Sequence, residues 1–298
     1  MRQANRWLLR DDRVIDLSSP RLMGVLNLTP DSFHAPSRVP DGDGAAASAL
    51  FMQRAGADIL DLGAESTRPG SARVPAQEQI ARLRAALDAL DGHRPPLAAP
   101  WSIDTTSSQV ARFALARGAA AINDVSAGLD DPDLFALASE HRCGLILMHR
   151  ALPPEADSYS DRYATAPMRG DVAEGVRAFL LDRAGVAMNA GVERDRICLD
   201  PGFGFGKTVE QNLELVRRID RIIDTGFPVL AGISRKSFVG RVGEPLRDTS
   251  PQERLPATLA LGLALVDRGV RLLRVHDVRE HAAAIRAWQA VTSARPSA

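Results

Sequence analysis

The strongest constraint on the fold is a repeated alternation of short apolar runs with longer helical patterns along the 298 residues. Such alternation is typical of βαβ units built around a parallel sheet. We expect eight strands, at 22–27, 58–63, 101–104, 119–124, 143–149, 196–200, 228–233 and 270–276. Eight helical segments lie near 44–56, 76–90, 107–117, 131–140, 168–190, 209–225, 251–268 and 277–291. Eight strands alternating with eight helices predict an α/β protein with the (β/α)8 fold of a TIM barrel.

Proline and glycine mark the expected helix ends. Pro75, Pro132 and Pro251 stand where helices begin, a position that tolerates the missing N–H of proline. The glycines that follow helical runs, as C-terminal caps do, are Gly56, Gly118, Gly191, Gly226 and Gly269.

The remaining segments complete a single-domain arrangement. Arg6 to Leu17 predicts a short N-terminal hairpin around Asp11-Asp12 that covers the bottom of the barrel. No linker divides the chain, so residues 1–298 are expected to form one domain. The tail at about 293–298 is expected to be disordered.

Charge and composition exclude several classes of function. Lysine plus arginine and aspartate plus glutamate number 37 each, so no net field favours nucleic acid or an anionic membrane. No apolar run is long enough for a membrane span, and Met1 to Arg10 lacks the apolar core of a signal peptide. Cys143 and Cys198 lie in apolar runs, as buried free thiols of a reducing compartment do. We therefore expect a cytoplasmic protein without nucleic-acid or membrane partners.

The segment from Leu199 to Thr208 is similar to a phosphate-binding loop but lacks its glycine spacing. Pro201 stands where a P-loop needs its first glycine, and the third glycine of a dinucleotide-binding turn is also missing. Instead, Asp200 ends an apolar run and precedes a loop with Phe203 and Phe205. A carboxylate at a strand end beside aromatic rings favours a flat polar heterocycle. The alternative is a glycine-rich turn that Asp200 merely caps.

In barrels of this kind the chemistry gathers at the C-terminal ends of the strands. Carboxylates and amides at these ends suit the N–H edge of a heterocycle, and cations suit an anion such as pyrophosphate. His149 is interpreted as a packing or loop-anchoring residue. A single polar strand end would also occur in a purely structural barrel, so the combination carries the argument. The strand ends hold Asn27, Asp61 with Glu65, Asp104, Asn123 with Asp124, His149, Asp200, Ser234-Arg235-Lys236, and Arg274 with His276 and Asp277.

Seven motifs in order then resemble one family. Met23 to Phe33 looks like the first loop of dihydropteroate synthases, and Glu65 to Gly70 is similar to their second loop. The other five are 102–105, 122–125, 199–207, 233–237 and 274–278, and the resemblance covers about residues 6–291. It implies a transferase of folate biosynthesis that joins 6-hydroxymethyl-7,8-dihydropterin diphosphate to 4-aminobenzoate. The products are 7,8-dihydropteroate and pyrophosphate. The resemblance further implies Mg²⁺, a homodimer and a sulfonamide target.

The resemblance also assigns roles to residues of this chain. Asp104, Asn123, Asp200 and Lys236 would hold the pterin. Arg68, Arg274 and His276 would hold the diphosphate and act with Lys236 in catalysis, and Asn27 would help to place Mg²⁺. The residues implied to line the 4-aminobenzoate site are Thr67, Pro69, Phe33, Phe205, Arg235 and Ser237.

Three segments depart from the family pattern. After Phe33 the family continues Ser-Asp-Gly-Gly, whereas this chain has His34-Ala35-Pro36-Ser37 and a longer insert at 38–44. Arg150-Ala151-Leu152 replaces the usual Met-Gln-Gly, and Pro256-Ala257-Thr258 replaces a Gly-Ser step. Two other functions therefore stay open at this point. One is a pterin-binding methyltransferase domain, and the other is a pterin-binding paralogue with low or no activity.

Overall fold

Eight parallel strands form the barrel that the alternation predicts. The computed structural model describes residues 4–28, 42–93 and 96–292. Hydrogen bonds connect the strands in the order β8-β7-β6-β5-β4-β3-β10-β9, and a parallel bridge between Leu199 and Val229 brings β8 and β9 together. The strands are β3 (Arg21–Asn27), β4 (Ile59–Gly63), β5 (Trp101–Asp104), β6 (Ala121–Asp124), β7 (Gly144–Met148), β8 (Ile197–Asp200), β9 (Leu230–Ala231) and β10 (Leu272–Val275).

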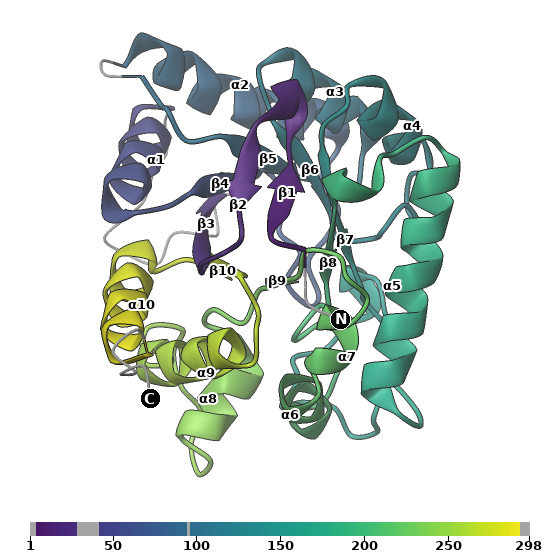
Figure 1. The fold of residues 1–298 in the computed structure, drawn as a ribbon, viewed down its shortest axis with the longest axis vertical. Helices are drawn as coiled ribbons and strands as arrows, with labels where there is room; N and C mark the ends of the chain where they lie inside the picture. Colours follow the sequence, from purple (N-terminus) through teal and green to yellow (C-terminus); the bar gives the residue numbers. More distant parts are fainter. Residues whose placement is uncertain (1–3, 29–41, 94–95, 293–298) are drawn as a thin grey trace, which may run out of the picture.

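A ring of helices surrounds the strands (Figure 1). The apolar faces of both layers form a continuous core that includes Leu60, Ile103, Leu145 and Leu199. Burial of this apolar surface is the main favourable term in folding. The helices are α1 (Gly42–Ala55), α2 (Ala76–Gly92), α3 (Ser108–Ala116), α4 (Asp133–Glu140), α5 (Val172–Asn189), α6 (Val209–Arg217), α7 (Asp220–Ile223), α8 (Ser237–Gly243), α9 (Leu255–Asp267) and α10 (Val278–Thr292).

The glycine caps are confirmed, because all five predicted cap glycines have φ between 77° and 109°. Left-handed backbone of this kind is accessible to glycine at little cost. The structure corrects the helix predictions in three places. The helix expected at 209–225 is interrupted at Arg218, whose φ of −114° leaves the helical region. α9 begins at Leu255 rather than near Pro251, and Pro256 lies in its first turn. The short helix α8 was not predicted, since seven residues show little periodicity.

The N-terminal hairpin closes one end of the barrel, as the sequence predicts. β1 (Arg6–Leu8) and β2 (Val14–Asp16) pair antiparallel, and they cross the centre of the ring in Figure 1. Trp7 and Leu9 are fully buried and pack with Ile59, Cys198 and other residues at the N-terminal ends of the strands. The other end of the barrel is therefore the one available for ligands.

Other predictions concern thiols, membranes and the termini. Cys143 and Cys198 are buried free cysteines, as expected. Within the described residues, we find no helix with the length and apolar character needed to cross a membrane. The tail at 293–298 and the part of the first loop from Thr29 to Asp41 lie outside the described residues.

Candidate active site

Side chains from four strands meet in the barrel at its C-terminal end. Arg274 on β10 donates from Nε to Asp61 Oδ2 on β4 and from Nη2 to Asp104 Oδ2 on β5, each over 2.6 Å. Asn123 on β6 donates from Nδ2 to the same Asp61 oxygen over 2.9 Å. These strands bring together residues 170 or more positions apart in the chain, such as Arg274 and Asp104.

Asp61 is the centre of this network, although the sequence indicated only that it stands at a strand end and assigned it no ligand. It is fully buried and also accepts a 2.5 Å hydrogen bond from Ser102 Oγ. A buried carboxylate is stable only when charges and donors compensate it, and Asp61 has three donors. It therefore fixes the side chains of both Arg274 and Asn123. A carboxylate inside the apolar run Ile59-Leu60-Asp61-Leu62 was the signal that could have identified it.

Asp104 presents an unused acceptor to the interior of the barrel. Its Oδ2 pairs with Arg274, but its buried Oδ1 has no hydrogen-bond partner within the described part of the chain. Burial raises the pKa of Asp104 to about 7, and the charge of Arg274 opposes this shift. An unpaired buried acceptor is costly for the free protein. A ligand N–H would satisfy it.

Asp200 and Lys236 form the opposite side of the site. Asp200 ends β8, and its Oδ1 accepts from Gly202 N over 2.7 Å, so the carboxylate does cap the following turn. Burial raises the pKa of Asp200, and the Lys236 ammonium opposes the rise. Lys236 Nζ donates to Phe203 O and lies 4.3 Å from the centre of the Phe205 ring.

The loop after β8 is shaped to admit the Lys236 side chain. Gly204 has a φ of 80°, and a Cβ there would lie 2.8 Å from Lys236 Cδ. Any larger residue would therefore displace Lys236. Loss of surrounding water lowers the pKa of Lys236 to about 7, although nearby Asp200 favours the charged form.

His276 is a neutral imidazole among cations. Burial and the charges of Arg235, Arg274 and Arg68 lower its pKa to about 3. Ser234 Oγ accepts from the His276 backbone N–H and lies 3.0 Å from Nδ1. The serine hydroxyl can then donate to Nδ1, which leaves the proton of the ring on Nε2. The neutral His276 ring is thus able to donate one hydrogen bond from Nε2.

The remaining predicted residues lie on loops around this site. Arg235 does not point freely into the site, because its Nε and Nη2 donate to the two oxygens of Asp277 over 2.9 and 2.5 Å. Ser237 is buried at the start of α8. Thr67, Arg68 and Pro69 lie on the loop after β4, where Arg68 is exposed. Phe33 lies outside the described residues.

His149 and Lys207 both have structural roles. The sequence predicted such a role for His149. Lys207 is fully buried, and its Nζ donates to Gly202 O over 2.8 Å and to Phe205 O over 3.1 Å. It also lies 3.0 Å from His149 Nδ1, whose ring packs edge-on against Phe179. The lysine of the segment similar to a phosphate loop therefore points inward and holds the loop together.

Replacing His149 by Gln is expected to make unfolding less sensitive to acid. Burial and the Lys207 charge lower the pKa of His149 from 6.5 to about 2. Below pH 6.5 the unfolded chain therefore binds a proton that the folded protein does not. The difference in the free energy of unfolding between wild type and variant is therefore most favourable to the wild type above pH 6.5. It falls by about 2 kcal/mol between pH 7 and pH 5. Urea unfolding at both pH values measures this difference. A difference that does not change with pH would contradict the neutral, buried state of His149.

Oxygen atoms suited to Mg²⁺ are present near Asn27. Both Asn27 Oδ1 and Asp104 Oδ2 border Gly63. If this glycine carried a side chain, its Cβ would lie 3.6 Å from the first oxygen and 3.7 Å from the second. Among residues 4–28, 42–93 and 96–292, no group of three His, Cys, Asp or Glu side chains is placed to hold a metal. Mg²⁺ often binds through one or two protein oxygens together with substrate phosphates and water, and Asn27 Oδ1 is an oxygen of this kind.

Comparisons with known proteins agree with this geometry. The family described as pterin binding enzyme matches residues 23–276. The dihydropteroate synthase of Synechocystis is 39% identical over 258 residues, which cover 86% of this chain and 85% of that protein. The structure of Xanthomonas albilineans dihydropteroate synthase with 4-aminobenzoic acid has a TM-score of 0.84 at 36% identity, covering 98% of this chain and 100% of that one.

A second structure of the Xanthomonas albilineans enzyme, in complex with 7,8-dihydropteroate, has a TM-score of 0.80 at 34% identity. It covers 96% of this chain and 100% of that one. Family match, sequence identity and structural likeness extend over nearly the whole chain, including the strand ends that form the site. The chain therefore belongs to the pterin-binding enzymes and, among them, to the dihydropteroate synthases.

Proposed function

We propose that this protein condenses 6-hydroxymethyl-7,8-dihydropterin diphosphate with 4-aminobenzoate and releases pyrophosphate. The observation that supports this most strongly is the buried Asp104 Oδ1, which has no partner within the described residues and lies next to Asn123 of the neighbouring strand, with Asp200 and Lys236 on the other side of the site. Acceptors and donors in this arrangement match the 2-amino-4-oxo edge of a pterin. Both structures with bound ligands named above are of the dihydropteroate synthase of Xanthomonas albilineans.

The leaving group would lie toward His276. Arg274 donates from two of its five N–H groups to Asp61 and Asp104, and among the described residues the others have no hydrogen-bond acceptor, so they could bind a diphosphate. Arg68 and the Nε2–H of His276 would add donors to the same anion. Donors of this kind stabilise the negative charge that grows as the C–O bond breaks. Mg²⁺, held in part by Asn27, would supply further charge neutralisation on the diphosphate.

The chemistry needs positioning more than a strong base. When the bond to the diphosphate breaks, the pterin ring delocalises the positive charge on its methylene group. The amino nitrogen of 4-aminobenzoate attacks that carbon and then loses a proton. Thr67, Pro69, Phe205, Arg235 and Ser237 would hold the second substrate, with Phe33 from the first loop. Arg235, fixed by Asp277, would then face the carboxylate of 4-aminobenzoate from a set position.

Replacing Asp200 by Asn should weaken pterin binding by about 2–3 kcal/mol while leaving the fold intact. The variant loses a charged acceptor for ring N–H groups, and its amide can still accept from Gly202 N. Isothermal calorimetry with a pterin that lacks the diphosphate measures the change. An unchanged affinity would remove Asp200 from the pterin site.

Complementation tests the proposed function in a cell. A strain that lacks its own dihydropteroate synthase should grow without added folate products when it expresses this chain. Growth that disappears with Lys236→Ala would link the rescue to the site. A stable, expressed wild-type chain that does not restore growth would favour a pterin-binding protein without the activity.

The family resemblance also supports a homodimer, a cytoplasmic location and sensitivity to sulfonamides as proposals. Light scattering of the purified chain tests the first of these. A mass near twice 32.1 kDa is expected, and a mass near 32.1 kDa would contradict it.

A further inference from the structure

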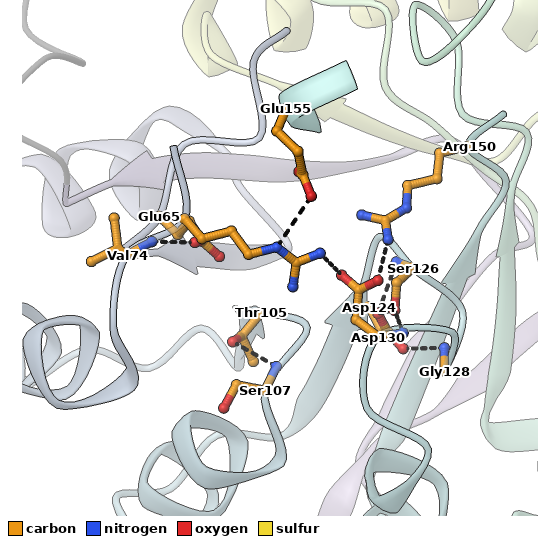
Figure 2. A network of polar contacts seen from close by, with 11 residues as sticks. Glu65, Val74, Thr105, Ser107, Asp124, Ser126, Gly128, Asp130, Arg150 and Glu155 are labelled. Carbon is orange, nitrogen blue, oxygen red and sulfur yellow. Dashed lines mark hydrogen bonds and ion pairs between the residues drawn. The ribbon is translucent and has the colours of Figure 1, made fainter. Parts of the chain in front are cut away.

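A chain of ion pairs links three loops at the ligand end of the barrel. Arg150, two residues after the end of β7, pairs with Asp130 of the loop after β6. Arg73, on the loop after β4, pairs with Asp130 over 3.0 Å and with Glu155 of the short helix η3 (Pro154–Ala156) over 3.6 Å. In Figure 2, Arg150 and Glu155 reach toward the region around Asp130 from the chain that follows β7.

The two arginines differ in their environment. The Arg150 side chain is 7% exposed and that of Asp130 is 12% exposed, so this pair is shielded from water. The Arg73 side chain is 54% exposed. Shielded pairs are weakly screened by salt, whereas exposed pairs contribute little to folding. Arg150 and Asp130 therefore form a fixed base, and Arg73 attaches the loop after β4 to it.

Asp130 is itself held in place by its own loop. Asp124, at the end of β6, accepts from Ser126 N over 2.8 Å and from Gly128 N over 2.5 Å. The Asp130 N–H then donates to Ser126 Oγ over 3.2 Å. These contacts connect Asp130 to the barrel strand, so its carboxylate is a firm anchor.

The attached loop is the one that carries Thr67, Arg68 and Pro69. Glu65 Oε1 accepts from Val74 N over 2.6 Å, which closes the loop at its base. Gly70 N donates to Pro154 O over 2.8 Å, which joins its tip to η3. A small cavity behind the loop is lined by Thr67, Arg73, Asp130 and Arg150 among others. The ion pairs thus border the same cavity as Thr67 of the loop.

We propose that Arg73, Asp130 and Arg150 are positioning residues that hold the 65–74 loop in the conformation that receives 4-aminobenzoate. The proposal rests on the function proposed above. It concerns a feature of this chain, because Arg150 stands where the family tends to carry methionine. The pterin would bind to Asp104, Asn123, Asp200 and Lys236. Within the described part of the chain, none of these side chains pairs with Arg73, Asp130 or Arg150, so the affinity for pterin should not depend on the ion pairs.

Arg73→Met is the most selective test. The variant should raise the KM for 4-aminobenzoate about fivefold, with kcat and pterin affinity nearly unchanged. Its stability should also be nearly unchanged, since Arg73 is half exposed. Steady-state kinetics, calorimetry with pterin and urea unfolding provide the three readouts. An unchanged KM would overturn the proposal.

Asp131→Asn is the matched control. Asp131 is adjacent to Asp130, but its carboxylate caps backbone N–H groups of Ser108 and Asp133. This variant should lose stability without a change in the KM for 4-aminobenzoate. If the KM rose in proportion to the loss of stability in both variants, the ion pairs would only stabilise the fold and the positioning role would be contradicted.

A pair of variants separates stability from positioning further. Asp130→Asn leaves the shielded Arg150 charge without its partner, so it should lose stability and raise the KM. Adding Arg150→Met should restore part of the stability but not the KM, because Arg73 still lacks its anchor. Full recovery of the KM in the double variant would contradict the assigned role.

Hydrogen exchange keeps the test independent of activity. The amides of residues 65–74 should exchange faster in Arg73→Met than in the wild type. In Asp131→Asn their exchange rates should equal those of the wild type. If the wild type forms no dihydropteroate, the proposed function fails, yet faster exchange would still support the attachment of the loop. Equal exchange in Arg73→Met and wild type would contradict it.

Discussion

Asp61→Ala is expected to lower the free energy of unfolding by about 3–5 kcal/mol, the largest effect on stability that the site predicts. The carboxylate is fully buried and accepts from Arg274, Asn123 and Ser102. Its removal leaves a cavity and takes the acceptor away from three donors, so that Arg274 retains Asp104 alone. Pterin binding should be weakened as well, because Asn123 is no longer held in place. Urea unfolding measures the first effect and calorimetry the second.

Asp58→Ala is the matched control for this prediction. Asp58 also accepts from an arginine and from a backbone N–H, namely those of Arg21 and Leu22, but it is partly exposed at the hairpin end of the barrel. Its loss should cost about 1 kcal/mol and leave pterin affinity unchanged. Equal losses of stability in the two variants would show that Asp61 is not the centre of the network.

Arg274→Lys should slow turnover about 100-fold, which corresponds to roughly 3 kcal/mol of lost stabilisation of the leaving group. Lysine keeps a positive charge for Asp61 and Asp104, so the fold should persist where alanine would leave two buried carboxylates unpaired. A single ammonium lacks the forked donors with which arginine reaches two carboxylates and a diphosphate at once. The comparison of kcat with the affinity for unphosphorylated pterin isolates the effect.

The expected signature is a large fall in kcat with a change in that affinity of less than about threefold. Equal losses in turnover and in the binding of unphosphorylated pterin would place Arg274 against the pterin ring and not against the leaving group.

The barrel could be predicted from the sequence because each strand and each helix end is marked by residues close together in the chain. Apolar runs mark strands such as 101–104, and positive-φ glycines such as Gly118 and Gly269 end the helices. The hairpin followed from a turn signal at Asp11-Asp12, and both of these aspartates adopt positive φ. The helix α8 was missed because a segment of seven residues carries too few positions to show a period.

The site was only partly accessible, because side-chain pairing depends on residues far apart in the chain. Asp104, Asn123, Asp200, Lys236 and Arg274 were placed at strand ends, and the structure brings them together. That Arg274 pairs with Asp61 could not be read from the sequence, since 213 positions separate them. The neutral state of His276 and the engagement of Arg235 by Asp277 likewise arise from neighbours that only the folded barrel supplies.

The most direct test of the central claim is product formation by the purified protein. Given the pterin diphosphate, 4-aminobenzoate and Mg²⁺, the wild type should release pyrophosphate and 7,8-dihydropteroate in equal amounts, and omission of 4-aminobenzoate should abolish dihydropteroate. Tight pterin binding with no dihydropteroate would contradict the account and would favour a pterin-binding protein that does not catalyse the condensation.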